Sequence, residues 1–234
     1  MRVALFFAAS VLFAGCSPAP PGGQRTTELT PLSPSRAAAA PSTAPTTAAT
    51  SSAPPGGTSA APAADASIAE VIQWTEAASP TDPADFGVAL RGGTATPLGE
   101  DVAFTNAAGT TCMTDTRRGS AALACLVDLR EPPAQPADVY GVWKGGWVDF
   151  DGSSVQIGSA HGDPGRFAAG QGPPLPPDRS LSFGDFRCRT DPAVLVCVNY
   201  ARQTAVRYSD DGIESWGCSR QVPPAAGIGI EFRC

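Results

Sequence analysis

The stretch 181–200, LSFGDFRCRTDPAVLVCVNY, decides the fold class of this chain. Apolar residues recur at every second position near both of its ends, which is the spacing of two short β-strands. Asp191-Pro192 lies between the two runs and is typical of a turn. Cys188 and Cys197 are therefore expected to meet across a hairpin, where a disulfide can join them.

A weaker copy of this hairpin lies upstream. The segment CMTD at 112–115 corresponds to CRTD at 188–191. In each copy a strand of the pattern Val-x-aromatic follows, VDF at 148–150 and VRY at 206–208, and leads into an Asp-Gly turn. We therefore predict a two-fold internal repeat, with an insertion in the first copy around residues 132–136.

Six of the seven cysteines lie in the region of these hairpins and beyond it. Six cysteines allow fifteen pairings, and we expect neighbours to pair because each neighbouring pair brackets a turn between expected strands. The expected disulfides are Cys112–Cys125, Cys188–Cys197 and Cys218–Cys234. Each closes a loop of about ten to seventeen residues and contributes roughly 3 kcal/mol through loop-closure entropy. Such disulfides predict an oxidising compartment.

Residues 1–16 have the pattern of a targeting segment: Arg2 is followed by an apolar run, 3–13, and then by small residues. The sequence FAGC at 13–16 resembles the lipobox of bacterial lipoproteins, with Phe where an aliphatic residue is usual. The resemblance implies that Cys16 becomes the acylated mature N-terminus, whose palmitate-type chains hold the protein on the membrane. The alternative is an ordinary secreted protein with a free Cys16 thiol.

Three regimes of composition divide the 234 residues. After the signal peptide and lipobox, 1–16, residues 17–64 are almost entirely Ala, Pro, Ser, Thr and Gly, which predicts a disordered linker. Residues 65–234 are long enough for one domain with a core of its own. This domain has 13 basic and 21 acidic residues, a formal net charge of −8. Nucleic acid is therefore not an expected partner, because binding phosphates requires clustered positive charge.

One helix and a series of strands are expected in the domain. Residues 65–67 cap a helix that ends near Ala78, covers one face of a sheet and places Trp74 at the edge of its apolar stripe. Gly145-Gly146 is expected to form a bend between strands. The strand-like runs, besides the two cysteine hairpins, are 86–90, 102–105, 139–143, 147–150, 155–157, 205–208 and 228–234. The prediction is a mainly β, compact, disulfide-stapled antiparallel domain with one N-terminal amphipathic helix.

Four short segments resemble uncharacterised envelope lipoproteins of mycobacteria and related actinobacteria, of the LppI kind. They are GDP at 162–164, FGDFRCR at 183–189, LVCVN at 195–199 and WGC at 216–218. The resemblance covers about residues 137–220. It implies an extracytoplasmic place in the cell envelope and disulfides, and the family has no activity to carry over.

The motifs do not assemble into a catalytic or metal site. His161 is the only histidine, and it shares a Gly-rich loop with Ser159 and Asp163 but no nucleophile elbow, so no Ser-His-Asp triad is expected. With the cysteines in disulfides, zinc is not expected either. The segment DFDGS at 149–153 offers two carboxylates as a calcium loop does, but it lacks the further ligands and terminal Glu, and Asp-Gly favours a tight turn. We expect no cofactor.

Four aromatic residues form the other concentration of interest: Tyr140, Trp143, Trp147 and Trp216. On neighbouring strands they would make an exposed platform that stacks on sugar rings. The alternative, which strand aromatics favour, is that they fill the core.

The sequence thus predicts a lipid-anchored protein on the extracytoplasmic face of the cell membrane, acting as a non-catalytic binding or structural module. Its expected partners are the membrane, through the lipid, and an envelope glycan, lipid or protein. The alternative is an envelope glycan hydrolase, which needs two carboxylates facing each other across a cleft.

Overall fold

Two large β-sheets make up most of the structure, a computed structural model that describes residues 60–116, 120–160 and 165–234, all within one compact unit. The six-stranded sheet has the order β1 (Ser79–Pro80), β9 (Arg179–Phe183), β10 (Phe186–Thr190), β11 (Leu195–Asn199), β12 (Thr204–Ser209), β13 (Gly212–Trp216). The seven-stranded sheet has the order β14 (Arg220–Val222), β15 (Ile228–Arg233), β8 (Ser154–Ala160), β7 (Trp143–Phe150), β6 (Ser120–Leu126), β5 (Thr111–Asp115), β4 (Ala103–Thr105).

A hairpin, one α-helix and two 3-10 helices complete the described fold. They are β2 (Val88–Arg91), β3 (Thr94–Pro97), α1 (Ile68–Glu76), η1 (Pro83–Phe86) and η3 (Gly165–Ala169). Apart from the parallel pair β1–β9, the strand pairs of both sheets are antiparallel. The structure also contains the three expected disulfides, Cys112–Cys125, Cys188–Cys197 and Cys218–Cys234. The predicted fold class is confirmed.

The internal repeat appears as two five-stranded meanders, β4 to β8 and β9 to β13, one in each sheet. In each meander a disulfide joins the second and third strands, and the fourth strand places a valine, Val148 or Val206, directly opposite the second cysteine. These are the equivalences that the sequence predicts. The connection between the third and fourth strands differs, because residues 127–142 form a long loop in the first meander and residues 200–203 a short turn in the second.

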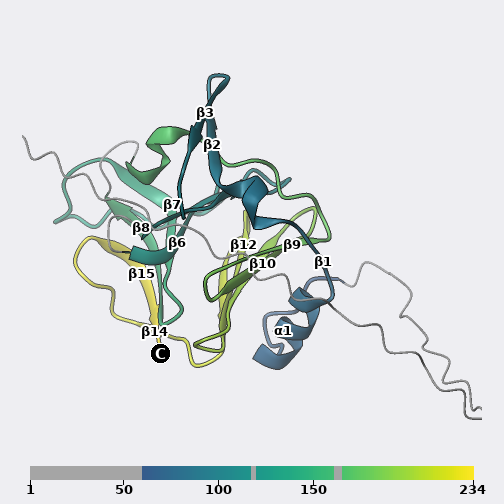
Figure 1. Ribbon diagram of the computed structural model, residues 1–234. Helices are drawn as coiled ribbons and strands as arrows, with labels where there is room; N and C mark the ends of the chain where they lie inside the picture. The colour runs from purple at the N-terminus through teal and green to yellow at the C-terminus, as the bar shows by residue number, and fades with distance from the viewer. Residues whose placement is uncertain (1–59, 117–119, 161–164) are drawn as a thin grey trace, which may run out of the picture. The chain divides into compact units, whose positions relative to one another are not determined.

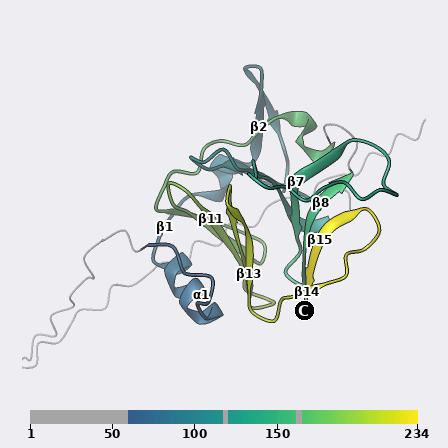
Figure 2. The ribbon, with the colours of Figure 1, turned by 180° about the vertical axis from the view of Figure 1, so that it is seen from behind.

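The two sheets pack face to face and enclose the main core (Figures 1 and 2). The disulfides of both meanders lie in this core, and their four cysteines are fully buried. Phe150 of β7 meets Phe186 of β10 edge to face, with ring centroids 5.5 Å apart, so aromatic contacts join the sheets. The domain is therefore a β-sandwich, with each strand alternating between an inner and an outer face.

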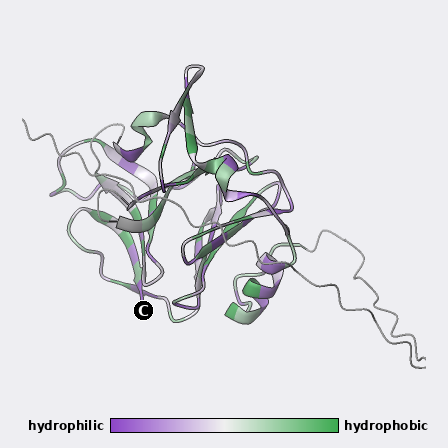
Figure 3. Ribbon diagram, in the orientation of Figure 1, coloured by the Kyte–Doolittle hydropathy of each residue, from purple (hydrophilic) through white to green (hydrophobic). Residues whose placement is uncertain are grey.

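Helix α1 covers the outer face of the six-stranded sheet, as predicted (Figure 2). It begins with a capping box, in which the Ser67 hydroxyl accepts from the Glu70 amide and the Glu70 carboxylate accepts from the Ser67 amide. The helix carries both apolar and polar residues (Figure 3). Trp74 is buried rather than at the edge of the apolar stripe, because the Arg189 guanidinium of β10 lies 3.9 Å from its ring centroid.

The prediction fails between β6 and β7. Residues 139–143 do not form a separate strand, and Gly145-Gly146 is not a bend between two strands, because β7 runs through both glycines with an irregular register. A side chain at Gly146 would meet the Val127 carbonyl oxygen at 1.9 Å. The two glycines therefore allow the loop 127–142 to pack directly on the strand backbone.

Candidate ligand-binding pocket

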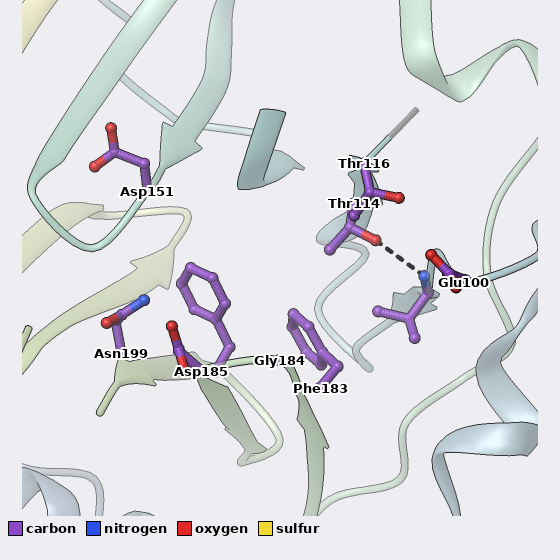
Figure 4. Close-up of a pocket in the computed structure, with 10 residues that line it drawn as sticks. Glu100, Thr114, Thr116, Asp151, Phe183, Gly184, Asp185 and Asn199 are labelled. Carbon is purple, nitrogen blue, oxygen red and sulfur yellow. Dashed lines mark hydrogen bonds between the residues drawn. The ribbon is translucent and has the colours of Figure 1, made fainter. Parts of the chain in front are cut away.

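An open cavity of about 300 Å³ lies at one end of the sandwich, with walls from both sheets. It is lined by Glu100, Val102, Thr114, Thr116, Asp151, Phe183, Gly184, Asp185, Phe186 and Asn199. Figure 4 shows Asp151 and Asn199 on one side, Glu100, Thr114 and Thr116 on the other, and Phe183, Gly184 and Asp185 between them. The ends of five strands or turns that are distant in sequence thus converge on one space.

The apolar wall of the cavity comes from Phe183 and Phe186, on either side of the β9–β10 turn. Their rings are stacked, with centroids 5.6 Å apart and planes at 20°. Phe186 is buried, whereas Phe183 is half-buried and also contacts Phe104 of the core. The core therefore holds the Phe183 ring in place while part of it remains open to a ligand.

Asn199, the last residue of β11, supplies a fixed polar group. Its Oδ1 accepts from the Arg202 amide at 3.0 Å, which identifies the other atom of the amide as Nδ2. Within the described part of the chain Nδ2 has no hydrogen-bond partner, although Asn199 is only 3% exposed. Figure 4 shows this nitrogen on the side that faces the cavity. Asn199 therefore offers a donor to whatever occupies the space.

The carboxylates of the pocket are of two kinds. Asp151 belongs to its own turn, where it accepts from the Ser153 amide at 2.7 Å, the Ser154 amide at 2.7 Å and the Ser154 hydroxyl at 3.0 Å. Glu100 and Asp185 are exposed and form no ion pair among the described residues. Among the described residues that line the pocket there is no Lys or Arg. This described lining thus has free acceptors on two sides and no positive charge for an anionic ligand.

A buried network supports the wall opposite Asn199. Asp101 accepts from the Thr114 hydroxyl at 2.9 Å and from the Thr116 amide at 2.7 Å. The Thr114 oxygen in turn accepts from the Val102 amide at 3.0 Å. Asp101 and Thr114 are both buried, so these contacts fix the end of β5 against the segment before β4.

The structure does not bring the four predicted platform residues together. Trp147 is 1% exposed under η3, where its ring meets Phe167 at 5.2 Å, and Trp216 is 4% exposed under α1, where Nε1 donates to the Ala63 carbonyl. Trp143 donates to the Pro133 carbonyl at 2.9 Å, and Tyr140 is 90% exposed in the loop 127–142. A common aromatic platform is therefore wrong, because the two buried indoles cover the outer faces of different sheets.

The predicted Asp-Gly turn at 149–153 is present. Asp149 accepts from the Trp147 indole at 2.8 Å and lies 3.5 Å from Arg166, so it belongs to the outer face of β7 rather than to a calcium loop with Asp151. No group of three or more potential metal ligands occurs within 60–116, 120–160 and 165–234. Cys16, His161 and Asp163 lie outside the described residues.

Among the described residues, Glu70 and Glu231 have a lowered carboxyl pKa, and neither lines the pocket. Hydrogen bonds from the Ser67 backbone and side chain lower the pKa of Glu70. At Glu231 burial acts to raise the pKa, but hydrogen bonds from Gln156, the Ala225 amide and Arg233 outweigh it and leave the pKa lowered. Both shifts favour ionised side chains in structural roles.

The pocket residues were not predicted from sequence. Phe183, Gly184 and Asp185 belong to a motif that the sequence marks as a strand end followed by a turn, and Asn199 follows an apolar strand. The sequence signal at this site is a Gly-Asp turn between Phe183 and Phe186. This signal predicts a hairpin, but it does not predict that a second sheet faces the hairpin and closes a pocket.

Comparisons of the chain with protein-family models, with curated proteins and with solved structures each give no match. Among the described residues, no helix has the length and apolar character needed to cross a membrane.

Proposed function

We propose that this chain is a lipid-anchored envelope protein whose β-sandwich binds a neutral glycan without cleaving it. The lipid anchor rests on the lipobox-like sequence ending at Cys16. The glycan rests on the cavity between the sheets. The three disulfides agree with an oxidising location outside the cytoplasm.

The observation that carries the proposal is the chemistry of the cavity lining. Sugars present apolar C–H faces and a rim of hydroxyl groups, so they fit an aromatic ring flanked by hydrogen-bonding side chains. Phe183 provides the ring, Asn199 a donor, and Glu100 and Asp185 free acceptors. Anionic ligands such as phosphate are disfavoured by the described lining, because none of its side chains is cationic.

A glycan hydrolase is the second candidate, favoured by the position of Glu100 across the cavity from Asp151 (Figure 4). Asp151, however, already accepts three hydrogen bonds within its turn. A nucleophile or general base must be free to approach the sugar or its attacking water. Binding without cleavage therefore accounts better for this lining.

The test is isothermal titration calorimetry of the full chain with neutral oligosaccharides, anionic oligosaccharides and alkylammonium ions. We expect only the neutral sugars to bind and to raise the melting temperature, since a ligand at 100 times its Kd adds about 2.7 kcal/mol of stability. Asn199→Asp keeps the size of the side chain but replaces the free donor with an acceptor, and should weaken binding about tenfold.

Asp138→Ala is the matched control, because Asp138 is an exposed aspartate on the loop 127–142 and does not line the pocket. Its affinity should equal that of the unmodified chain. Binding of alkylammonium ions in place of sugars would overturn the proposal. Release of new reducing ends from a bound oligosaccharide would assign the hydrolase instead.

A further inference from the structure

Two further depressions adjoin the pocket, one on each side. The first has a volume of about 360 Å³ and shares Gly184, Asp185 and Phe186 with the pocket. The second has a volume of about 290 Å³ and shares Thr114 with it. The three spaces therefore follow one another across the end of the sandwich, from the outer side of the six-stranded sheet to the outer side of the seven-stranded sheet.

We propose that the ligand is a linear glycan of at least three sugar units, with one unit in the central pocket and its neighbours in the two flanking depressions. This inference rests on the proposed glycan-binding function. A space of about 300 Å³ lies at the lower limit for small-molecule sites, so the central pocket alone encloses little more than one sugar ring.

The first depression also combines a ring with polar groups, and its one cationic side chain among the described residues, Arg187, donates to the Ala78 carbonyl at 3.3 Å and to the Ser180 hydroxyl at 3.0 Å. Tyr200 contributes a half-buried ring, and its hydroxyl donates to the Glu76 carboxylate at 3.1 Å. Burial and the neighbouring Glu76 raise the pKa of the Tyr200 hydroxyl, which therefore remains neutral. The Tyr200 amide donates to the Asp185 carbonyl at 2.9 Å, so this ring is held directly beside the β9–β10 turn.

Gly184 forms the boundary between this depression and the pocket. Its φ is +49°, and a Cβ built on it would meet nothing within 4 Å. The turn therefore presents backbone without a side chain at the point where a linear glycan would pass from the pocket into the depression. Asn tolerates this backbone conformation, so a side chain can be added here without disturbing the fold.

The second depression combines apolar and polar groups on the other side. Half-buried Leu98 offers apolar surface above the buried Met113, and Asp101, Thr114 and Arg166 surround it. The Arg166 guanidinium is already committed, since it donates to the Met113 carbonyl at 3.4 Å and the Ala122 carbonyl at 3.1 Å and lies 3.5 Å from Asp149. This charge is thus neutralised within the protein, which suits a neutral sugar.

The experiment measures affinity for a length series of one neutral sugar, from monomer to hexamer, by calorimetry on the full chain. We expect affinity to rise at least tenfold from monomer to trimer. Gly184→Asn should remove most of this rise with length, whatever its effect on the monomer, because Gly184 lines both the pocket and the first depression. Gly92→Asn is the control, because Gly92 also has positive φ (+55°) and open space around it but lies in the β2–β3 turn.

The outcomes separate the two proposals. If monomer and trimer bind equally, the extended ligand is ruled out while glycan binding stands. If no member of the series binds, the proposed function itself fails. If the affinity of both Gly184→Asn and Gly92→Asn still rises tenfold from monomer to trimer, the ligand does not cross the β9–β10 turn.

Discussion

The two ends of the sandwich carry the same turn in different surroundings. Asp151-Gly152 joins β7 to β8 at the end with the pocket, and Asp211-Gly212 joins β12 to β13. Their positions within the two meanders are equivalent, since both turns follow the strand that pairs with the second cysteine. The β7–β8 turn and the β9–β10 turn line the same pocket. Because successive turns of an antiparallel meander alternate between ends, the β12–β13 turn lies at the opposite end from both.

At the end without the pocket, Arg130 neutralises the turn. Its guanidinium bridges Asp210, at 2.8 Å, and Asp211, and its amide donates to the Asp210 carbonyl at 2.9 Å. Arg130 belongs to the loop 127–142, which only the first meander has. At the pocket end the corresponding connection is the short turn 200–203, and the cavity lined by Asp151 stays open. The inserted loop, rather than the turn sequence, makes the two ends differ.

The largest expected effect tests whether the two meanders are equivalent in stability. Replacing Cys112 and Cys125 together with alanine, or Cys188 and Cys197 together, should lower the free energy of unfolding by about 3 kcal/mol in each case. Both disulfides are fully buried at the same position in the repeat. Urea unfolding of the two double variants measures the losses, and a difference of more than about 2 kcal/mol would show that the halves are not equivalent.

The next effect distinguishes the two turns. A Cβ at Gly152, where φ is +91°, would meet the Asn199 side chain at 2.6 Å, whereas a Cβ at Gly212 would meet nothing within 4 Å. Gly152→Ala should therefore cost about 2 to 3 kcal/mol, and Gly212→Ala about 1 kcal/mol from backbone strain alone. Thermal unfolding checks the order. Equal losses would show that Asn199 can move aside, and would remove the argument for a fixed donor in the pocket.

The smallest effect concerns the ion pairs of Arg130. Its side chain is 66% exposed, and those of Asp210 and Asp211 are 50% and 67% exposed. Arg130→Ala should therefore cost less than about 1 kcal/mol, with a smaller loss at high salt. Urea unfolding at two salt concentrations measures it. A loss above 2 kcal/mol that is insensitive to salt would mean that Arg130 anchors the whole loop 127–142 by packing.

The helix, the strands and the disulfides that are encoded by residues close together in the chain could be predicted from the sequence. The Ser67 cap, the period-2 runs and the spacing of the cysteines each depend on residues that are near one another in the chain. The loop 127–142 could not be predicted correctly, because Gly145 and Gly146 are also typical of a bend. Their role as strand positions appears only when Val127 and Pro132 lie against them, with Pro132 2.7 Å from a Cβ built at Gly145.

Trp147 and Trp216 show a second reason why part of the structure could not be predicted from the sequence. Strand periodicity places Trp147 on the same face of its strand as Asp149, and Trp216 on the same face as Glu214. It does not say whether either face meets the other sheet, a helix or solvent. The structure covers one with η3 and the other with α1. Burial on an outer face depends on elements far away in sequence, which no local pattern specifies.

The sequence by itself determined the hairpins, the nearest-neighbour disulfides, the single helix and the repeat, because short-range periodicity and turn chemistry encode each of them. Only the tertiary structure decided how the two meanders face each other and where a gap remains between them. The pocket is formed by Glu100, Thr114, Phe183 and Asn199 from separate segments. Their proximity follows from packing two twisted sheets, in which a short turn leaves one end open and an inserted loop occupies the other.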